Sequence, residues 1–286
     1  MGEGLRVSIT LSGLSRLLGA SLAGVIDTAA QADAAGIDQI AVPDHLAIGP
    51  RLDRYPYGRF PLPPDEPWLE PLVTLAAIAG ATRHIRLATT VLVAPLRPAL
   101  LLAKTIATLD VLSRGRLDLG VGIGWQREEF TAAGVPFEAR AARLDDQLRA
   151  CRALWEGGPV SFHSASVAFD DLVCQPRPLQ TGGVPIWFGV ALTPRNVGRI
   201  AELGAGWLPI GSDLTEIARG VGVLRGAFAK RGRDPATLGV RAHAPALDAL
   251  PRMREAGVTI AAFALGRFVR SPDAVRAFFD QIAALR

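Results

Sequence analysis

Short apolar segments with a strand-like pattern alternate along this chain with longer segments of helical periodicity. Residues 85–93 form a near-continuous apolar run, residues 101–112 place apolar side chains at helical spacing, and residues 117–121 alternate between apolar and other side chains. Pro98 suits the first turn of the intervening helix, and Gly115 suits its C-terminal cap. This order predicts two parallel strands joined by a helix within one sheet.

The same unit of glycine, short strand and helix recurs along the whole chain. Eight units in 286 residues correspond to about 36 residues each, which is the spacing of a (β/α)8 TIM barrel. We therefore predict one barrel domain over residues 1–286. An open doubly wound sheet is the alternative, and it requires a reversal of strand order. The predicted strand centres are Ser8, Ala41, Thr90, Leu119, Trp187, Leu208, Arg241 and Ala261.

Three connections are longer than an ordinary link between strand and helix. They are residues 44–67 after the second strand, 125–142 after the fourth and 158–183 before the fifth. Long ordered loops in a compact domain usually serve binding. The alternation within residues 158–183 predicts a hairpin insertion.

Composition narrows the class of protein. Hydrophobic residues make up 49% and charged residues 20%, so the chain can bury a large core. The basic residues behind the net charge of +4 are dispersed, which argues against nucleic acid and leaves small acidic ligands as partners. The sequence has no run of about eighteen uncharged apolar residues and no export signal, and its two cysteines form no disulfide framework. We expect a cytoplasmic protein without membrane spans.

Polar side chains follow the second strand and interrupt the third. Asp44 and His45 lie where barrel enzymes place catalytic groups, and a histidine there can exchange a proton near neutral pH. In the structural alternative, Asp44 caps a turn and His45 is a solvated loop residue. Thr89 and Thr90 need hydrogen-bond partners in an apolar strand, which a ligand or the backbone could provide.

Three glycines end the fourth predicted strand. Gly120, Gly122 and Gly124 form a GxGxG pattern that lacks the third glycine of the dinucleotide fingerprint. They permit the backbone to approach a flat ligand closely. Trp125 could pack on that ligand or belong to the core. Glu129 is expected to pair with an arginine of a loop.

The fifth predicted strand leads into a well-formed helix start. Thr193 and Pro194 fit the cap and first turn, and the amides of residues 190–196, with Arg195, could hold a phosphate. An ordinary capped helix explains the same residues. The four histidines are isolated, so no metal site is predicted, and no nucleophile elbow or Walker loop occurs.

Together these segments resemble the luciferase-like barrel superfamily, in particular its branch of oxidoreductases that use the deazaflavin coenzyme F420. The resemblance covers roughly residues 20–210 and is most specific in the block from RHIRLATTVLVAPLRP to LGVGIGWQREEF. It implies a barrel whose C-terminal mouth holds a flavin or deazaflavin, and relatives often form homodimers. A non-proline cis peptide is implied at Thr90–Val91. The cofactor-binding residues that it implies are Thr89, Thr90, Val91, Gly122, Gly124, Trp125, Gly189, Val190, Ala191 and Arg195, with His45 and Asp44 as the catalytic pair.

One departure bears on the reaction. Sugar-phosphate dehydrogenases of this family carry a glutamate about where this chain has Trp125, which disfavours alcohol oxidation. The resemblance instead favours hydride transfer from reduced F420 to an activated alkene or imine, with His45 or a water supplying the proton. Arg51, Arg54 and Arg59 are candidates to meet the acidic tail of the coenzyme. The alternatives are an FMNH2-dependent monooxygenase and a non-catalytic barrel that binds flavin or deazaflavin.

Overall fold

A closed barrel of parallel strands forms the centre of the computed structural model, which describes residues 4–285. The strand order is β3-β2-β1-β11-β10-β9-β8-β5-β4, and the pairing of β3 with β5 closes the ring. Segments β3 and β4 both pair with β5 and together make the third barrel strand. The prediction of a (β/α)8 barrel is confirmed, and the open sheet is excluded. The strands are β1 (Arg6–Thr10), β2 (Gln39–Val42), β3 (Arg86–Thr89), β4 (Leu92–Val93), β5 (Leu117–Gly122), β8 (Ile186–Gly189), β9 (Gly206–Leu208), β10 (Gly239–His243) and β11 (Ile260–Ala264).

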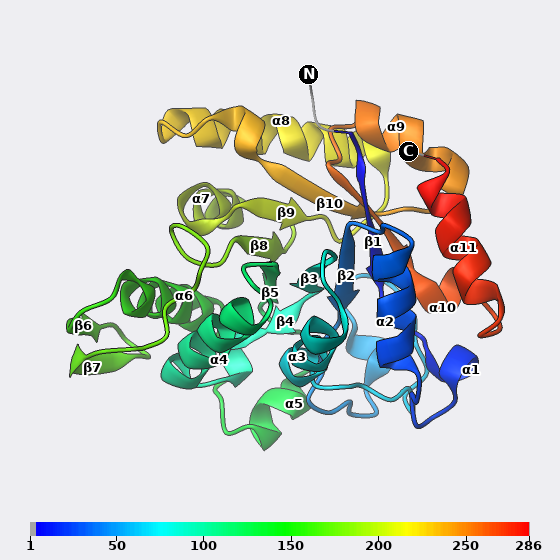
Figure 1. Ribbon diagram of the computed structural model, residues 1–286. Coiled ribbons are helices and arrows are strands. Elements are labelled where there is room, and N and C mark those ends of the chain that lie inside the picture. The colour runs from blue at the N-terminus through cyan, green and yellow to red at the C-terminus, as the bar shows by residue number, and fades with distance from the viewer. Residues whose placement is uncertain (1–3, 286) are drawn as a thin grey trace.

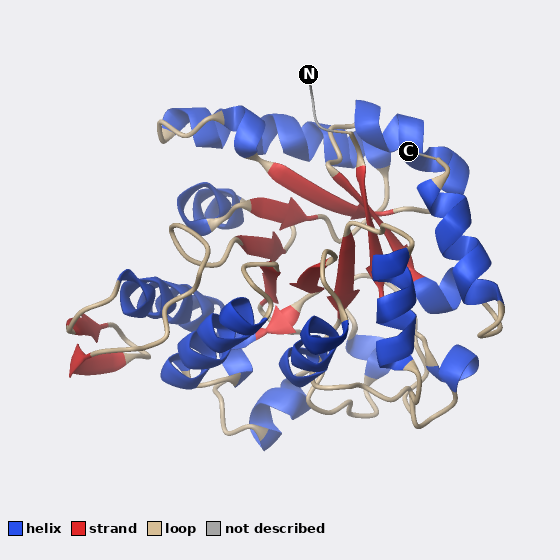
Figure 2. Cartoon of the chain, in the orientation of Figure 1, coloured by secondary structure: helices blue, strands red, loops and turns tan. Residues whose placement is uncertain are grey.

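Helices cover the outside of this ring (Figures 1 and 2). Each barrel strand is followed by one long or medium helix, which packs its apolar face on the strands. The helices of the outer layer are α2 (Val25–Ala34), α3 (Pro71–Ala81), α4 (Ala99–Leu112), α6 (Arg140–Glu156), α7 (Pro194–Leu203), α8 (Leu214–Lys230), α9 (Leu250–Glu255) and α11 (Ala274–Ala283). Within residues 4–285 no helix is both long enough and apolar enough to cross a membrane.

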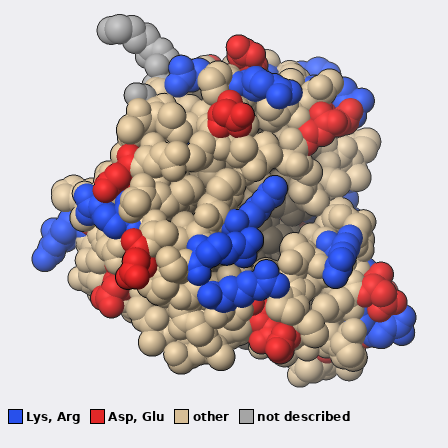
Figure 3. Space-filling model, turned by 90° about the vertical axis from the view of Figure 1, so that its right-hand side faces the viewer, with Lys and Arg blue, Asp and Glu red and all other residues tan. Residues whose placement is uncertain are grey.

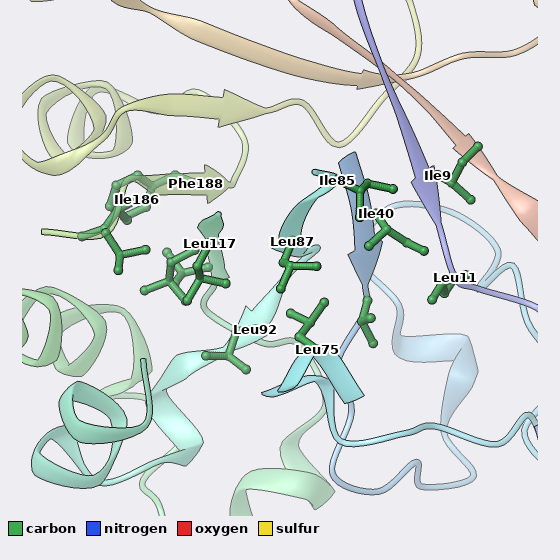
Figure 4. Packing of buried hydrophobic residues seen from close by; sticks show 14 of the residues in the cluster. Ile9, Leu11, Ile40, Leu75, Ile85, Leu87, Leu92, Leu117, Ile186 and Phe188 are labelled. Atoms are coloured by element: carbon green, nitrogen blue, oxygen red, sulfur yellow. The ribbon is translucent and has the colours of Figure 1, made fainter. Parts of the chain in front are cut away.

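Alternation along the strands separates an apolar outer layer from a partly polar interior. Ile9, Ile40, Leu87 and Phe188 are fully buried between strands and helices, and Figure 4 shows Leu75 of α3 near Leu87. The near-continuous apolar runs of the sequence suggest strands that are apolar on both faces. In the structure, several inward positions instead carry polar side chains that hydrogen-bond to one another. These inward polar residues are Ser8, Thr10, Gln39, Arg86, Asp118 and Arg241.

The long connections form structures of their own. Strands β6 (Val160–His163) and β7 (Ala168–Leu172) make the antiparallel hairpin that the sequence predicts, and it projects from the edge of the barrel in Figure 1. The connection after β2 contains η1 (Leu52–Arg54), and the one after β5 contains α5 (Arg127–Ala132). Two short helices, α1 (Ser15–Leu18) and α10 (Leu265–Phe268), follow β1 and β11. The other short helices are η2 (Ala94–Leu96), η3 (Pro235–Thr237) and η4 (Leu247–Ala249).

The helix ends of α4 differ slightly from the prediction. Pro98 is the N-cap residue, so the helix begins one residue later, at Ala99. Gly115 lies two residues beyond the C-cap Ser113, where its φ of 76° and its amide bond to the Asp110 carbonyl close the turn. A left-handed conformation of this kind is adopted most readily by glycine.

Candidate cofactor and active site

A cavity of about 730 Å³ opens at the carboxyl ends of the barrel strands. Every barrel strand contributes to its lining through its last residues or its following loop. A cavity of this volume is in the range that holds a cofactor together with a small molecule. Of the residues expected at the site, it brings together Asp44, His45, Thr90, Val91, Gly122, Gly124, Trp125 and Gly189.

Val91 stands on the floor of this cavity between two glycines. A Cβ built on Gly122 would lie 2.6 Å from Cγ2 of Val91, and one on Gly189 would lie 2.5 Å from Cγ1. Both glycines therefore make room for Val91, whereas the sequence interpretation placed Gly122 beside a flat ligand and Gly189 near a phosphate. Gly124, with φ of 75°, likewise leaves room for the Phe130 ring, 2.6 Å from the position of its missing Cβ.

The two threonines of the third strand have different surroundings. The Thr89 hydroxyl donates to the Gly120 carbonyl over 2.6 Å, and Thr89 does not line the cavity. The backbone thus satisfies the hydroxyl, which was the structural alternative for this residue. Thr90 lines the cavity, and its hydroxyl accepts a hydrogen bond from Arg241 over 2.8 Å. The peptide between Thr90 and Val91 is cis, as the resemblance implies.

His45 is held by a carboxylate that comes from the loop after β5. Its Nδ1 lies 3.1 Å from Oε2 of Glu129, and Oε1 of the same carboxylate accepts the amide of Leu46 over 2.6 Å. Both side chains are buried, at 7% and 1% exposure. Glu129 was expected to pair with a loop arginine, but its neighbour Glu128 does so, with Arg54. The imidazole is thus held in place by the buried Glu129 carboxylate.

An aromatic wall surrounds the His45 ring. The wall consists of Tyr55, Tyr57, Phe60, Trp68 and Trp125, all of which line the cavity. The ring centroids of Trp68 and Trp125 lie 4.8 and 5.9 Å from that of His45, with near-perpendicular planes. Edge-to-face packing of this kind fixes ring orientations and removes water from the imidazole.

Asp44 has a structural role in the described geometry. Its carboxylate accepts two bonds from Arg97, at 2.7 and 3.1 Å, and one from the amide of Val93 at 2.8 Å. The carboxylate is therefore committed to an ion pair and to the backbone of β4. We take Asp44 as a residue that positions the loop bearing His45.

The predicted phosphate site at the start of α7 lies outside the cavity. Val190 is buried and its carbonyl accepts the indole N–H of Trp207, while Ala191 is exposed without lining the cavity. Arg195 points to Asp145, 3.2 Å away. The Thr193 cap and Pro194 are present as predicted, so the ordinary capped helix accounts for this segment.

A different group of arginines faces the cavity. Arg16 follows β1, and Arg267 and Arg270 follow β11. The amide of Gly266 donates to the Ser12 carbonyl, which joins the loops that carry them. No carboxylate among the described residues pairs with these three arginines. Figure 3 views the side of the molecule that carries α1 and α10, and there basic side chains lie beside a hollow in the surface. In contrast, the arginines expected to meet an acidic tail do not line the cavity: Arg51 pairs with Asp53, Arg54 with Glu128, and Arg59 is exposed.

His243 completes the polar lining from β10. His243 is exposed to the cavity at the end of β10, and desolvation inside the barrel mouth, together with the charges of Arg241 and Arg267, lowers its pKa to about 4. The imidazole is therefore neutral at pH 7. Sequence reasoning did not select His243 or the three arginines, although the position after a barrel strand was a usable signal for His243, Arg267 and Arg270.

The fold and its cavity define an α/β-barrel enzyme with a ligand site at the C-terminal rim. Residues 6–250 match the family described as luciferase-like monooxygenase, and the chain belongs to this family.

Several named proteins are similar to this chain. An uncharacterized protein of Mycobacterium tuberculosis is 36% identical over 259 residues, which cover 88% of this chain and 90% of that protein. An F420-dependent glucose-6-phosphate dehydrogenase of Amycolatopsis mediterranei is 30% identical over 62% of this chain and 51% of its own length. An FMNH2-dependent dimethylsulfone monooxygenase of Pseudomonas putida is 35% identical over 36% of this chain and 29% of its own length.

Solved structures share the fold at low sequence identity. An F420-dependent secondary alcohol dehydrogenase superposes with a TM-score of 0.77 at 14% identity, covering 99% of this chain and 100% of the other. The monooxygenase RslO1 of Streptomyces bottropensis gives 0.70 at 23% identity, covering 98% and 89%.

Proposed function

We propose that this protein is an oxidoreductase that transfers a hydride from reduced F420 to a small activated alkene or imine. The observation that carries the proposal is the cavity at the barrel mouth. Its lining includes Val91, a histidine bonded to a glutamate, and three arginines that form no ion pair with a carboxylate within residues 4–285. The family supports a flavin or deazaflavin cofactor, since its members include enzymes named for F420 and for FMNH2.

The residues present fit such a cofactor. A planar ring system needs a raised apolar surface to rest on, and Val91 projects into the cavity between Gly122 and Gly189. F420 carries an acidic tail, and Arg267 and Arg270 provide positive charge that no carboxylate of the described residues pairs with. When bound, F420 supplies the hydride. The protein would hold ring and acceptor in contact and exclude water with the aromatic wall.

Proton transfer is assigned to His45. With Nδ1 donating to Glu129, Nε2 is the nitrogen that can hold a proton and release it toward the cavity. Glu129 would keep the imidazole in this tautomer and orientation. This proton would go to the atom bonded to the carbon that receives the hydride, which is the neighbouring carbon of an alkene or the nitrogen of an imine. Sugar-phosphate dehydrogenases of the family carry a glutamate about where this chain has Trp125. In this chain a carboxylate enters the site four residues later, as Glu129, the partner of His45.

FMNH2-dependent oxygenation is the second candidate function. It is supported by the similarity to the dimethylsulfone monooxygenase. The two candidates differ in the cofactor that binds and in the need for oxygen, because a deazaflavin has carbon in place of flavin N5 and reacts poorly with oxygen. A non-catalytic barrel would bind a cofactor without turnover.

The test is a binding and turnover experiment with the whole chain. Reduced F420 and reduced FMN are titrated separately, and coenzyme oxidation is then followed with a panel of enones and imines under anaerobic conditions. We expect F420 to bind and to be oxidised. His45→Ala and Glu129→Gln should retain binding while turnover falls by about 10²–10⁴-fold for His45→Ala and less for Glu129→Gln. Binding of FMN alone would overturn the cofactor assignment, and full turnover by His45→Ala would overturn the proton assignment.

A further inference from the structure

Arg241 places a cation inside the barrel just below the cavity. The residue is only 4% exposed and lies on β10, two positions before His243. Its Nη1 donates to the Thr90 hydroxyl over 2.8 Å, and its Nη2 donates to the Thr10 hydroxyl over 2.7 Å. Both threonines line the cavity, whereas Arg241 does not. The guanidinium is therefore one layer of residues away from a ligand on the cavity floor.

Within the part of the chain that the structure describes, no carboxylate bonds directly to Arg241. Its Nε donates to Gln39 Oε1 over 3.1 Å and to the Ser8 hydroxyl over 3.3 Å, and both acceptors are neutral. Gln39 in turn donates to Asp118 over 2.8 Å, but Asp118 forms a 2.6 Å ion pair with Arg86. Arg86 is also linked through Gln180 to a second carboxylate, Asp110. Both carboxylates thus lie on the Arg86 side of the network, whereas the hydrogen bonds of Arg241 go to neutral groups.

The environment leaves this charge in place at neutral pH. Burial lowers the pKa of Arg241 to about 10, which is still three units above pH 7. A buried cation without its own counter-ion raises the free energy of the empty site. Negative charge that develops in the cavity would relieve this cost, because the attraction acts through protein rather than bulk water.

Hydride uptake creates such a negative charge. A ring that accepts a hydride gains two electrons and one proton and so gains one unit of negative charge, while the hydride donor loses one. This balance holds equally for a flavin and for a deazaflavin. We propose that Arg241 is a positioning residue whose buried charge stabilises the hydride-reduced form of the ring above Thr90 relative to its oxidised form. The inference rests on the proposed function only in requiring that the cavity bind a redox ring that exists in an oxidised and a hydride-reduced form.

The test compares the affinities of the two redox forms. Dissociation constants of oxidised and reduced F420, and of oxidised and reduced FMN, are measured for the wild type and for Arg241→Met. The measured quantity is the dissociation constant of the oxidised coenzyme divided by that of the reduced coenzyme. We expect this ratio to be at least tenfold lower in Arg241→Met than in the wild type. For a two-electron couple this equals a fall of about 30 mV in the midpoint potential of the bound coenzyme. Arg241→Lys keeps the charge and should retain most of the preference.

Two further variants separate charge from structure. Ser8→Ala removes a neutral partner of Arg241 and should leave the preference unchanged. Asp118→Asn removes the carboxylate that is linked to Arg241 through Gln39. It should therefore raise the affinity for the reduced coenzyme relative to the oxidised coenzyme. This opposite sign tests the inference even where Arg241→Met does not fold.

The outcomes distinguish this inference from the proposed function. The inference is overturned if Arg241→Met weakens the binding of both redox forms equally. It is also overturned if Asp118→Asn shifts the binding preference toward the oxidised form. Either result would leave Arg241 with a purely structural role. A wild type that binds neither coenzyme would overturn the proposed function and this inference together.

Discussion

The floor of the cavity gives a quantitative prediction about packing. Replacing Gly189 by alanine would place its Cβ 2.5 Å from Cγ1 of Val91, well inside van der Waals contact. Gly189 ends β8, which is paired with β5 and β9 on its two sides, so its backbone has little freedom to move. Overpacking at such a site costs about 1–3 kcal/mol. We expect Gly189→Ala to lower the free energy of unfolding by this amount.

A second substitution should relieve the clash. Val91→Ala removes both γ-methyl groups and leaves the Val91 Cβ, which is 3.6 Å from the new methyl position on residue 189. That separation is an ordinary contact. The double variant Gly189→Ala, Val91→Ala should therefore be more stable than the sum of the single effects predicts, by on the order of 1–2 kcal/mol.

Urea unfolding of the wild type, both single variants and the double variant measures this coupling. Gly198→Ala is the matched control, because nothing lies within 4 Å of its added Cβ on helix α7. It should be neutral or stabilising by up to about 1 kcal/mol. Additivity of the Gly189 and Val91 effects within about 0.5 kcal/mol would refute the steric explanation of the glycine.

Three other predictions concern charges at the cavity. Asp44→Asn breaks the buried ion pair with Arg97 and should lower the free energy of unfolding by about 3 kcal/mol. Urea unfolding measures this loss. A loss below about 1 kcal/mol would contradict the structural role of Asp44. The pKa of His243 is lowered to about 4 from 6.5, so its stabilising contribution is present above pH 6.5 and is lost as pH falls toward 4. His243→Asn should reduce the pH dependence of stability in that window, and an NMR titration midpoint near 6.5 would contradict this. The double variant Arg267→Ala, Arg270→Ala should weaken F420 binding about tenfold and should make the remaining affinity less dependent on salt concentration. Calorimetry measures this affinity, and an unchanged value would exclude these arginines from the site.

Local pattern was sufficient to predict the architecture. The eight predicted strand centres lie in or directly beside the observed barrel strands, and the hairpin of β6 and β7 falls within the predicted insertion. These features depend on periodicity and on the positions of glycine and proline, which neighbouring residues determine. The position of His45 directly after β2 also placed it at the cavity from sequence alone, since strand ends of a parallel barrel meet at one rim.

Only the tertiary structure decided which side chains meet. Glu129 bonds to His45 across 84 positions of sequence, and Arg241 bonds to Thr90 across 151. Gly189 leaves the space that the Val91 side chain occupies. Such pairings follow from the register between strands and from the closure of the ring, which bring inward-facing positions of distant strands to the same height. A single sequence contains the residues of these pairs, but the distances between them arise only when the barrel closes.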